Sequence, residues 1–277
     1  MDAATRRILQ KERQRISWTR FKLPQEQNWP EWPTSYPNRY RGPFTDVAGC
    51  QQLCLGRQVD YPDEAVFIVF WESADALNDF QHSPACGEFL QGLGCENESL
   101  LSLQYAKGLT MESALPGRVT LNILTIPYTG VPDRETWRDA ILSAFKGFMP
   151  KGGGTPNSPQ IFRWSTYAWV DDEQQKQPTP ADTAGQRQAT CYQFYCWIGA
   201  GTTVNEEEVS AKDPESYGLW AERMARAMPP VEAWVQERWH IKREPIDIDP
   251  EEEDDEYYRN YVVDVKDPVA ERLVREG

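Results

Sequence analysis

Residues 64–93 read EAVFIVFWESADALNDFQHSPACGEFLQGL, and this stretch decides the fold class. Residues 64–72 are apolar on both faces and rich in β-branched and aromatic side chains, which predicts a buried strand. Ser73 is a typical helix N-cap. Pro84 is expected to break the following helix near Ser83, because proline removes a helical hydrogen bond and restricts the residue before it. The stretch therefore predicts a strand followed by a helix in two parts.

Similar patterns extend on both sides of this stretch. Apolar or alternating runs predict further strands over residues 99–107, 118–128, 160–170, 190–198 and 231–242. Helical spacing predicts helices over residues 133–148 and 214–228. Residues 118–242 then follow the order β-α-β-β-α-β of a ferredoxin-like unit, whereas residues 51–108 show only β-β-α-β. The predicted fold class is α+β, with tandem ferredoxin-like halves of which the first is either incomplete or rebuilt.

Four segments follow from this pattern. Residues 1–48 are expected to form a basic helix over residues 3–16 and an extended segment rich in proline and aromatic residues. Residues 49–112 would be the first half and residues 113–243 the second. Residues 244–277 would be an acidic tail, because like charges at high density repel one another and stay extended.

Charge and composition exclude several classes of function. The formal net charge is −14 and the pI is about 4.7, so binding to nucleic acid or to an anionic membrane is disfavoured. No apolar run is long enough to span a membrane, and no signal peptide is evident. Most of the 6 Cys are expected to be buried thiols in a reducing, cytoplasmic setting. With 2 His and scattered Cys, no zinc constellation and no cofactor are predicted.

The strand–helix stretch also resembles a known family. A strand ending in Trp71, the polar pair Glu72 and Ser73, an aromatic Phe80 and the Ser83–Pro84 pair are similar to the antibiotic biosynthesis monooxygenase-like group of the dimeric α+β barrel superfamily. The resemblance covers about residues 60–243 and implies two ferredoxin-like sheets that form a barrel within one chain. Its members include cofactor-independent oxygenases, haem-binding enzymes, cyclases and decarboxylase-like proteins. No catalytic motif of the family maps onto this chain, so no residue's role is transferred.

In such a barrel, one face of each strand points to the helices and the other to the interior, here called the lumen. Val119, Leu121 and Ile123 are expected to face the helices because they are apolar. The opposite faces combine aromatic and polar groups, as a ligand pocket does, although strand ends exposed to water would give the same alternation. The expected ligand-binding residues are Asn122, Tyr167, Gln193, Trp197, Trp234 and Arg238. The expected catalytic acid–base groups are His240, Arg163 and Tyr195.

Three hypotheses about function remain open from the sequence. The first is an enzyme that acts on an aromatic or polyketide-like small molecule in the barrel cavity without a metal, as a monooxygenase, cyclase or lyase. The second is a haem enzyme with His240 as the axial ligand. The third is a non-catalytic ligand-binding or interaction protein. Tandem halves reduce the need for a homodimer without excluding one.

Overall fold

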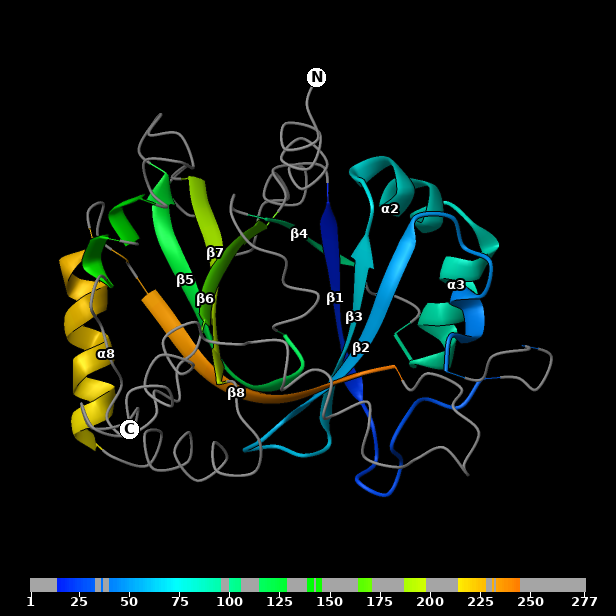
Figure 1. Ribbon diagram of the computed structural model, residues 1–277, viewed down its shortest axis with the longest axis horizontal. Coiled ribbons are helices and arrows are strands. Elements are labelled where there is room, and N and C mark those ends of the chain that lie inside the picture. Colours follow the sequence, from blue (N-terminus) through cyan, green and yellow to red (C-terminus); the bar gives the residue numbers. More distant parts are fainter. Residues whose placement is uncertain are drawn as a thin grey trace, which may run out of the picture. The chain divides into compact units, whose positions relative to one another are not determined.

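The computed structural model describes residues 14–32, 36, 40–95, 100–105, 115–128, 139–141, 143–145, 164–170, 187–197, 214–227, 231 and 233–244. These residues form one closed antiparallel barrel with the strand order β1-β3-β2-β8-β5-β7-β6-β4 (Figure 1). The first half contributes β1 (Arg15–Lys22), β2 (Cys50–Gln58), β3 (Glu64–Trp71) and β4 (Leu101–Tyr105). The second half contributes β5 (Gly117–Tyr128), β6 (Trp164–Val170), β7 (Arg187–Trp197) and β8 (Ala233–Arg243).

The closed order confirms the predicted fold class. Each half has the order of a ferredoxin-like sheet, which is β4-β1-β3-β2 in the first and β8-β5-β7-β6 in the second. The two sheets join through β2 with β8 and through β4 with β6. Both junctions lie within one chain, so the barrel closes without a second copy.

The first half has all four strands of a ferredoxin-like unit, so it is rebuilt and not incomplete. Strand β1 pairs with β3 from Arg15↔Trp71 to Lys22↔Glu64 and supplies the opening strand that seemed to be missing. The helix expected over residues 3–16 therefore cannot reach its predicted end, because Arg15 and Ile16 belong to β1; residues 3–13 lie outside the described residues. The alternation of Ile16, Trp18 and Arg20 with smaller polar residues is the strand signal that was overlooked.

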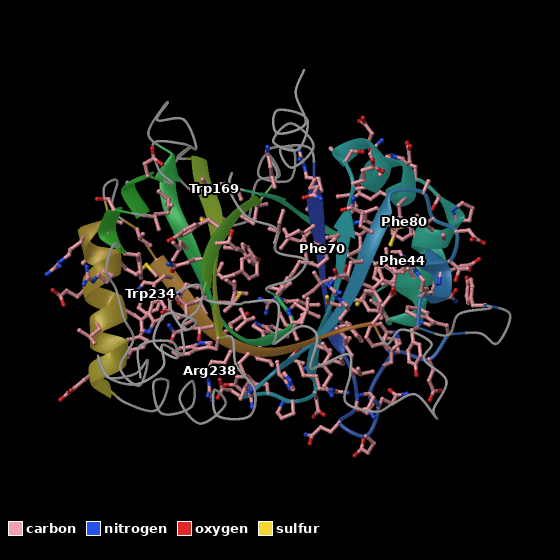
Figure 2. The ribbon with its side chains drawn as sticks, viewed as in Figure 1. Phe44, Phe70, Phe80, Trp169, Trp234 and Arg238 are labelled. Atoms are coloured by element: carbon pink, nitrogen blue, oxygen red, sulfur yellow. The ribbon has the colours of Figure 1, made fainter. Side chains whose placement is uncertain are left out.

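The proline-rich segment replaces the first helix of the ferredoxin-like order. It contains the short 3-10 helix η1 (Gly42–Phe44) and packs its aromatic side chains against β3 and the helices behind it. Phe44 is 1% exposed, and its ring centroid lies 4.9 Å from that of Phe80 and 4.8 Å from that of Phe89 (Figure 2). Gly42 has φ of +46°, and an added Cβ there would lie 2.4 Å from the Trp32 ring. This segment is therefore a packed cover of the sheet.

The helix after β3 is divided as the sequence predicts. Helix α2 (Ala74–Gln81) begins after Ser73, and α3 (Pro84–Gly92) begins after Ser83 with Pro84 at its first turn. Ser73 Oγ accepts a hydrogen bond of 3.1 Å from the backbone N–H of Ala76. Leu77 and Phe89 face the sheet and are buried. The two helices cover the outer face of the first half (Figure 1).

The N-cap at Ser73 gives a first testable prediction. Ser73→Ala is expected to lower the free energy of unfolding by about 1 kcal/mol, because one backbone donor at the start of α2 loses its acceptor. Ser73→Asp keeps an acceptor and is expected to retain nearly all of the stability. Urea unfolding of both variants checks this, and equal losses in the two would show that capping is not the cause.

Helix α8 (Pro214–Arg226) covers part of the second half. Its Trp220 packs against Tyr195 and Trp197 of β7, while Met224 packs against Leu124 and Ile126 of β5. The helix predicted over residues 133–148 is described only at 139–141 and 143–145, where residues 139–141 and 143–144 are helical. No helix among the described residues is long and apolar enough to cross a membrane.

Candidate functional site in the barrel lumen

Contacts between non-neighbouring strands identify the side chains that point into the lumen. The Trp18 ring of β1 lies 5.7 Å, centroid to centroid, from Phe194 of β7 and also from Trp239 of β8. Neither strand is adjacent to β1 in the barrel order, so these rings meet across the interior. The cluster around them takes residues from all eight described strands, among them Ile68, Leu121 and Ala168. The lumen is therefore lined mainly by apolar and aromatic side chains.

In the second half, the face of each strand that points into the lumen is the opposite of the predicted one. Val119, Leu121 and Ile123 belong to the lumen cluster, although they were expected to face the helices. Leu124 and Ile126, on the other face of β5, pack beneath Met224 of α8. Because side chains alternate along a strand, exchanging the two faces moves those predicted lumen residues that the structure describes to the outer face. The prediction failed because it assigned the apolar face of each strand to the helices. Here the face toward the helices and the face toward the lumen are both largely apolar.

Three of the predicted ligand-binding residues are brought together, but outside the lumen. Gln236 Nε2 donates to Asn122 Oδ1 at 3.0 Å, and Asn122 Nδ2 donates to Gln193 Oε1 at 2.9 Å. Gln193 Nε2 in turn donates to the Tyr167 hydroxyl at 3.3 Å. We call these four residues, from β8, β5, β7 and β6, the amide ladder. Asn122 and Gln193 are 0% exposed, so the ladder is a buried network with mutual partners.

The predicted aromatic site residues also lie on the outer face. Tyr195 and Trp197 are buried against Trp220 of α8, and Trp197 Nε1 donates to Thr120 Oγ1 at 2.9 Å. Trp234 is half-buried and stacks on Tyr217 of α8 with a centroid distance of 5.1 Å (Figure 2). Tyr195 therefore cannot act on a molecule held in the lumen from this position.

The predicted basic groups do not converge either. His240 is exposed on the outer face of β8, paired in register with Arg57 of β2 and Arg118 of β5. Partial burial, together with Arg118 and Lys242, lowers the pKa of His240. Arg238 pairs with Asp60 at the surface. Arg163 lies outside the described residues, and its catalytic role stays a prediction.

The placement of His240 bears directly on the haem hypothesis. A histidine on the outside of the barrel cannot ligate the iron of a haem held inside it. The other histidine, His82, lies at the end of α2 and contacts the backbone oxygen of Asn78 through Nδ1 at 2.8 Å. The described residues thus offer no histidine to a haem in the lumen.

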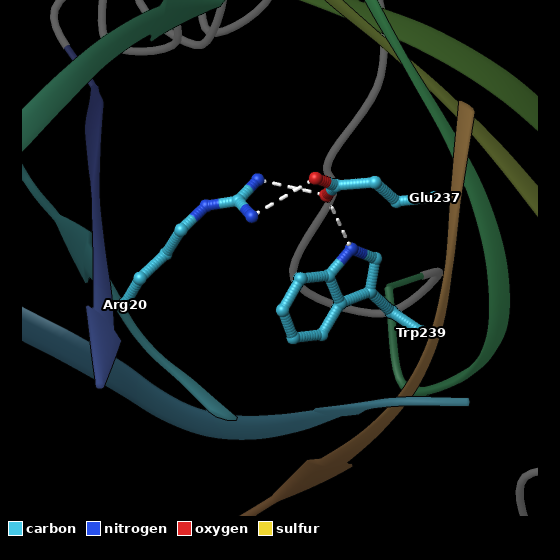
Figure 3. Close-up of polar contacts among 3 residues, drawn as sticks. All are labelled: Arg20, Glu237 and Trp239. Atoms are coloured by element: carbon cyan, nitrogen blue, oxygen red, sulfur yellow. Dashed lines mark hydrogen bonds and ion pairs between the residues drawn. The ribbon is translucent and has the colours of Figure 1, made fainter. Parts of the chain in front are cut away.

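The lumen instead contains an ion pair that the sequence analysis did not select. Arg20 of β1 and Glu237 of β8 form a bidentate pair, with Nη1 to Oε1 at 2.9 Å and Nη2 to Oε2 at 2.7 Å (Figure 3). Trp239 Nε1 also donates to Glu237 Oε2 at 2.9 Å. The Arg20 guanidinium carbon lies 5.4 Å from the centre of the Trp239 ring, a cation–π geometry.

Strand alternation explains why this pair points inward. Arg20 follows Ile16 and Trp18 on one face of β1, and Glu237 precedes Trp239 and Ile241 on one face of β8. A charged residue at a position shared with buried apolar residues was the signal available in the sequence. The Arg20 side chain is 39% exposed and that of Glu237 is 11% exposed, so the pair lies where the lumen meets solvent.

The surroundings of the pair raise the pKa of Arg20 and that of its neighbour Tyr192. Burial lowers the pKa of Arg20, but the hydrogen bond and charge of Glu237 outweigh it, so the pKa is raised overall. Burial raises the pKa of Tyr192, with Arg20 acting in the opposite direction. The Tyr192 hydroxyl is therefore protonated and able to donate at neutral pH. Lys22 lies two residues after Arg20 on the inward face of β1, and Glu64 lies on the inward face of the neighbouring β3. Their side chains form an ion pair at the solvent edge.

The lumen thiols are poor nucleophiles. Cys54 and Cys196 belong to the lumen cluster, and burial raises the pKa of Cys54 to about 12. The Cys196 pKa is raised for the same reason. A thiol with such a pKa carries almost no thiolate at neutral pH. All 6 Cys are free and all but Cys50 are buried, as expected from the sequence, and the described residues contain no cluster suited to a metal ion.

Comparisons with known proteins agree with the predicted resemblance. Residues 20–92, from β1 to the end of α3, match the family model described as antibiotic biosynthesis monooxygenase. No curated protein matches the chain. Among solved structures, an anthrone oxidase-like protein is 10% identical with a TM-score of 0.46, covering 86% of this chain and 96% of its own. A candidate monooxygenase from Lactobacillus acidophilus NCFM is 10% identical with a TM-score of 0.40, covering 84% and 95% respectively.

Proposed function

Because residues 20–92 carry an antibiotic biosynthesis monooxygenase domain within a closed α+β barrel, we propose that this protein is an enzyme acting on an aromatic small molecule in the lumen. The Arg20–Glu237 pair beside Tyr192 carries the proposal. It places one carboxylate, one guanidinium and one hydroxyl at the edge of an aromatic wall. Rings that provide contact area and a few polar groups that fix orientation are the usual features of a small-molecule site.

The reaction class follows from what these groups can do. Glu237 is a carboxylate within the lumen and can accept a proton from an acidic C–H or O–H group. Arg20 and Tyr192 can donate hydrogen bonds to the enolate or phenolate oxygen that results. An electron-rich oxyanion of this kind can itself reduce O₂, so we propose an oxygenase that needs no further reductant. A cyclase or lyase would share the deprotonation but would consume no oxygen.

Anthrone is a suitable probe because it is planar and has an acidic C–H group in the same ring as its carbonyl, opposite the carbonyl carbon. Loss of that proton to Glu237 would give the enolate. Overall, one anthrone and one O₂ would give one anthraquinone and one H₂O, so the substrate is the only reductant. We expect the protein to accelerate oxygen uptake with anthrone above the spontaneous rate, with anthraquinone formed in equal amount.

His240→Ala provides the matched control for this assay. His240 lies on the outer face, so its removal is expected to leave the oxygen uptake rate within about twofold. An oxygen electrode and chromatographic detection of anthraquinone check both statements. A large loss in His240→Ala, or no acceleration with anthrone or smaller enolisable phenolic ketones, would contradict the proposal.

A further inference from the structure

One polar atom deep in the lumen has no partner. The Nε1–H of Trp18 is buried, and no acceptor for it exists among the residues that the structure describes. The residue as a whole is 1% exposed, so bulk water does not reach the group either. Buried N–H groups are almost always paired, and leaving one unpaired costs a substantial part of the desolvation penalty. This donor therefore needs an explanation.

None of the described neighbours of Trp18 accepts from its N–H: Phe194 and Trp239 have no acceptor atom in their side chains, and the Tyr192 hydroxyl forms no hydrogen bond with it. Its ring is surrounded by Tyr192, Phe194 and Trp239, with centroid distances of 5.7–6.3 Å and tilted or edge-to-face geometry. The carboxylate of Glu237, which contacts Trp239, accepts from Trp239 and twice from Arg20. The two lumen indoles thus differ: one N–H is satisfied within the protein and the other is not.

We propose that the Trp18 N–H binds the uncharged carbonyl oxygen of a planar aromatic ligand in the lumen. The inference deepens the proposed function and rests on the lumen being the ligand site. The rings around Trp18 provide edges and faces for a flat molecule. A carbonyl oxygen fits better than an anion at this donor, because Trp18 is buried among apolar groups and has no cation of its own to neutralise a charge.

A substrate with two oxygens would then lie with its uncharged carbonyl toward Trp18, and with its reacting edge and the oxygen that becomes charged toward Arg20 and Glu237. Trp18 contacts Trp239, which contacts both members of the ion pair, so one planar molecule can reach the two regions. Trp18 would act as a specificity-determining residue, selecting ketones over hydrocarbons of the same shape. A site that pairs a buried donor discriminates strongly against analogues that lack the acceptor.

Binding of matched ligands tests this without any need for turnover. 9-Fluorenone and fluorene differ in the carbonyl group, as do 1-indanone and indane, and quenching of tryptophan fluorescence reports the binding of each. We expect the wild-type protein to bind at least one ketone about tenfold more tightly than its hydrocarbon. Trp18→Phe is expected to bring that ratio close to one, because it removes the N–H that binds only the ketone. The ketone and its hydrocarbon lose the same packing contacts, so that loss does not change the ratio.

Two further substitutions distinguish the effect of the indole N–H on binding from the effect of the ring's shape. 3-Benzothienylalanine at position 18 replaces the N–H by sulfur in a ring of nearly the same size, and it is expected to abolish the preference as Trp18→Phe does. Trp71→Phe is the matched control and is expected to keep the preference, because Trp71 lies on the outer face and its N–H is bonded to Ser17. A ketone preference that survives both changes at position 18, or is absent from the wild type, would overturn the inference. Oxygen uptake is not involved, so a failed activity assay leaves this test intact.

Discussion

Glu237→Gln is expected to reduce oxygen uptake with anthrone by on the order of 10²-fold or more. The amide keeps the size of the side chain, and its single oxygen can still accept from Trp239 and from one N–H of Arg20, while the second Arg20 N–H loses its acceptor; the amide cannot take a proton at neutral pH. The barrel should remain folded, so binding of 9-fluorenone is expected to change little. Rates measured with the oxygen electrode at saturating anthrone check this. An unchanged rate would show that Glu237 is not the base.

Arg20→Ala provides the companion experiment because it removes the cation and leaves the carboxylate. The Glu237 side chain is 11% exposed and would keep only the Trp239 donor, so we expect a stability loss of about 1–2 kcal/mol. That figure is reduced for solvent screening, since the Arg20 side chain is 39% exposed. Lys22→Ala is the matched control: it breaks the exposed pair with Glu64 and is expected to change neither stability nor rate appreciably.

Asn122→Ala is expected to lower the free energy of unfolding by about 3 kcal/mol while leaving ligand binding in the lumen intact. Asn122 is 0% exposed and bonds both Gln236 and Gln193. Its removal leaves one buried amide donor and one buried amide acceptor unpaired, and each costs about 1–3 kcal/mol. Urea unfolding measures the loss and fluorescence quenching measures the binding.

Thr125→Ala is a suitable control for this substitution. Thr125 is on β5 but is only half-buried, so we expect a loss of less than about 1 kcal/mol. A stable Asn122→Ala protein that no longer binds 9-fluorenone would reverse the assignment and return Asn122 to the ligand site. The result therefore decides between the two faces of β5.

Strong local signals made most of the fold predictable. The strand over residues 64–71 and the division of the helix at Pro84 follow from alternation, capping and proline geometry. Strand β1 was missed because it lies between an Arg-rich N-terminal stretch and a proline-rich segment, both of which suggested other structures. Its pairing with β3 and β4 is a long-range property that no local window reveals.

The site was harder to predict because its position depends on which face of each strand turns inward. The sequence shows that side chains alternate between the two faces of a strand, but not which face points to the lumen. A face that packs against helices and a face that lines an apolar lumen need similar residues. The contact of Asn122 with Gln193 follows from the ferredoxin-like strand order, but its place beneath the helices does not, and the contact of Gln193 with Tyr167 was not predicted. The Arg20–Glu237 pair joins residues from opposite ends of the barrel sequence, so only the closed sheet reveals it.

The most direct measurement is a ¹⁵N–¹H spectrum of the tryptophan indole groups during titration with 9-fluorenone. Single Trp→Phe variants assign the signals. If the ligand binds in the lumen, the indole signals of Trp18 and Trp239 shift, whereas those of Trp71 and Trp197, bonded to Ser17 and Thr120 on the outer face, remain in place. Shifts confined to Trp71 and Trp197, or none at saturating ligand, would contradict the account.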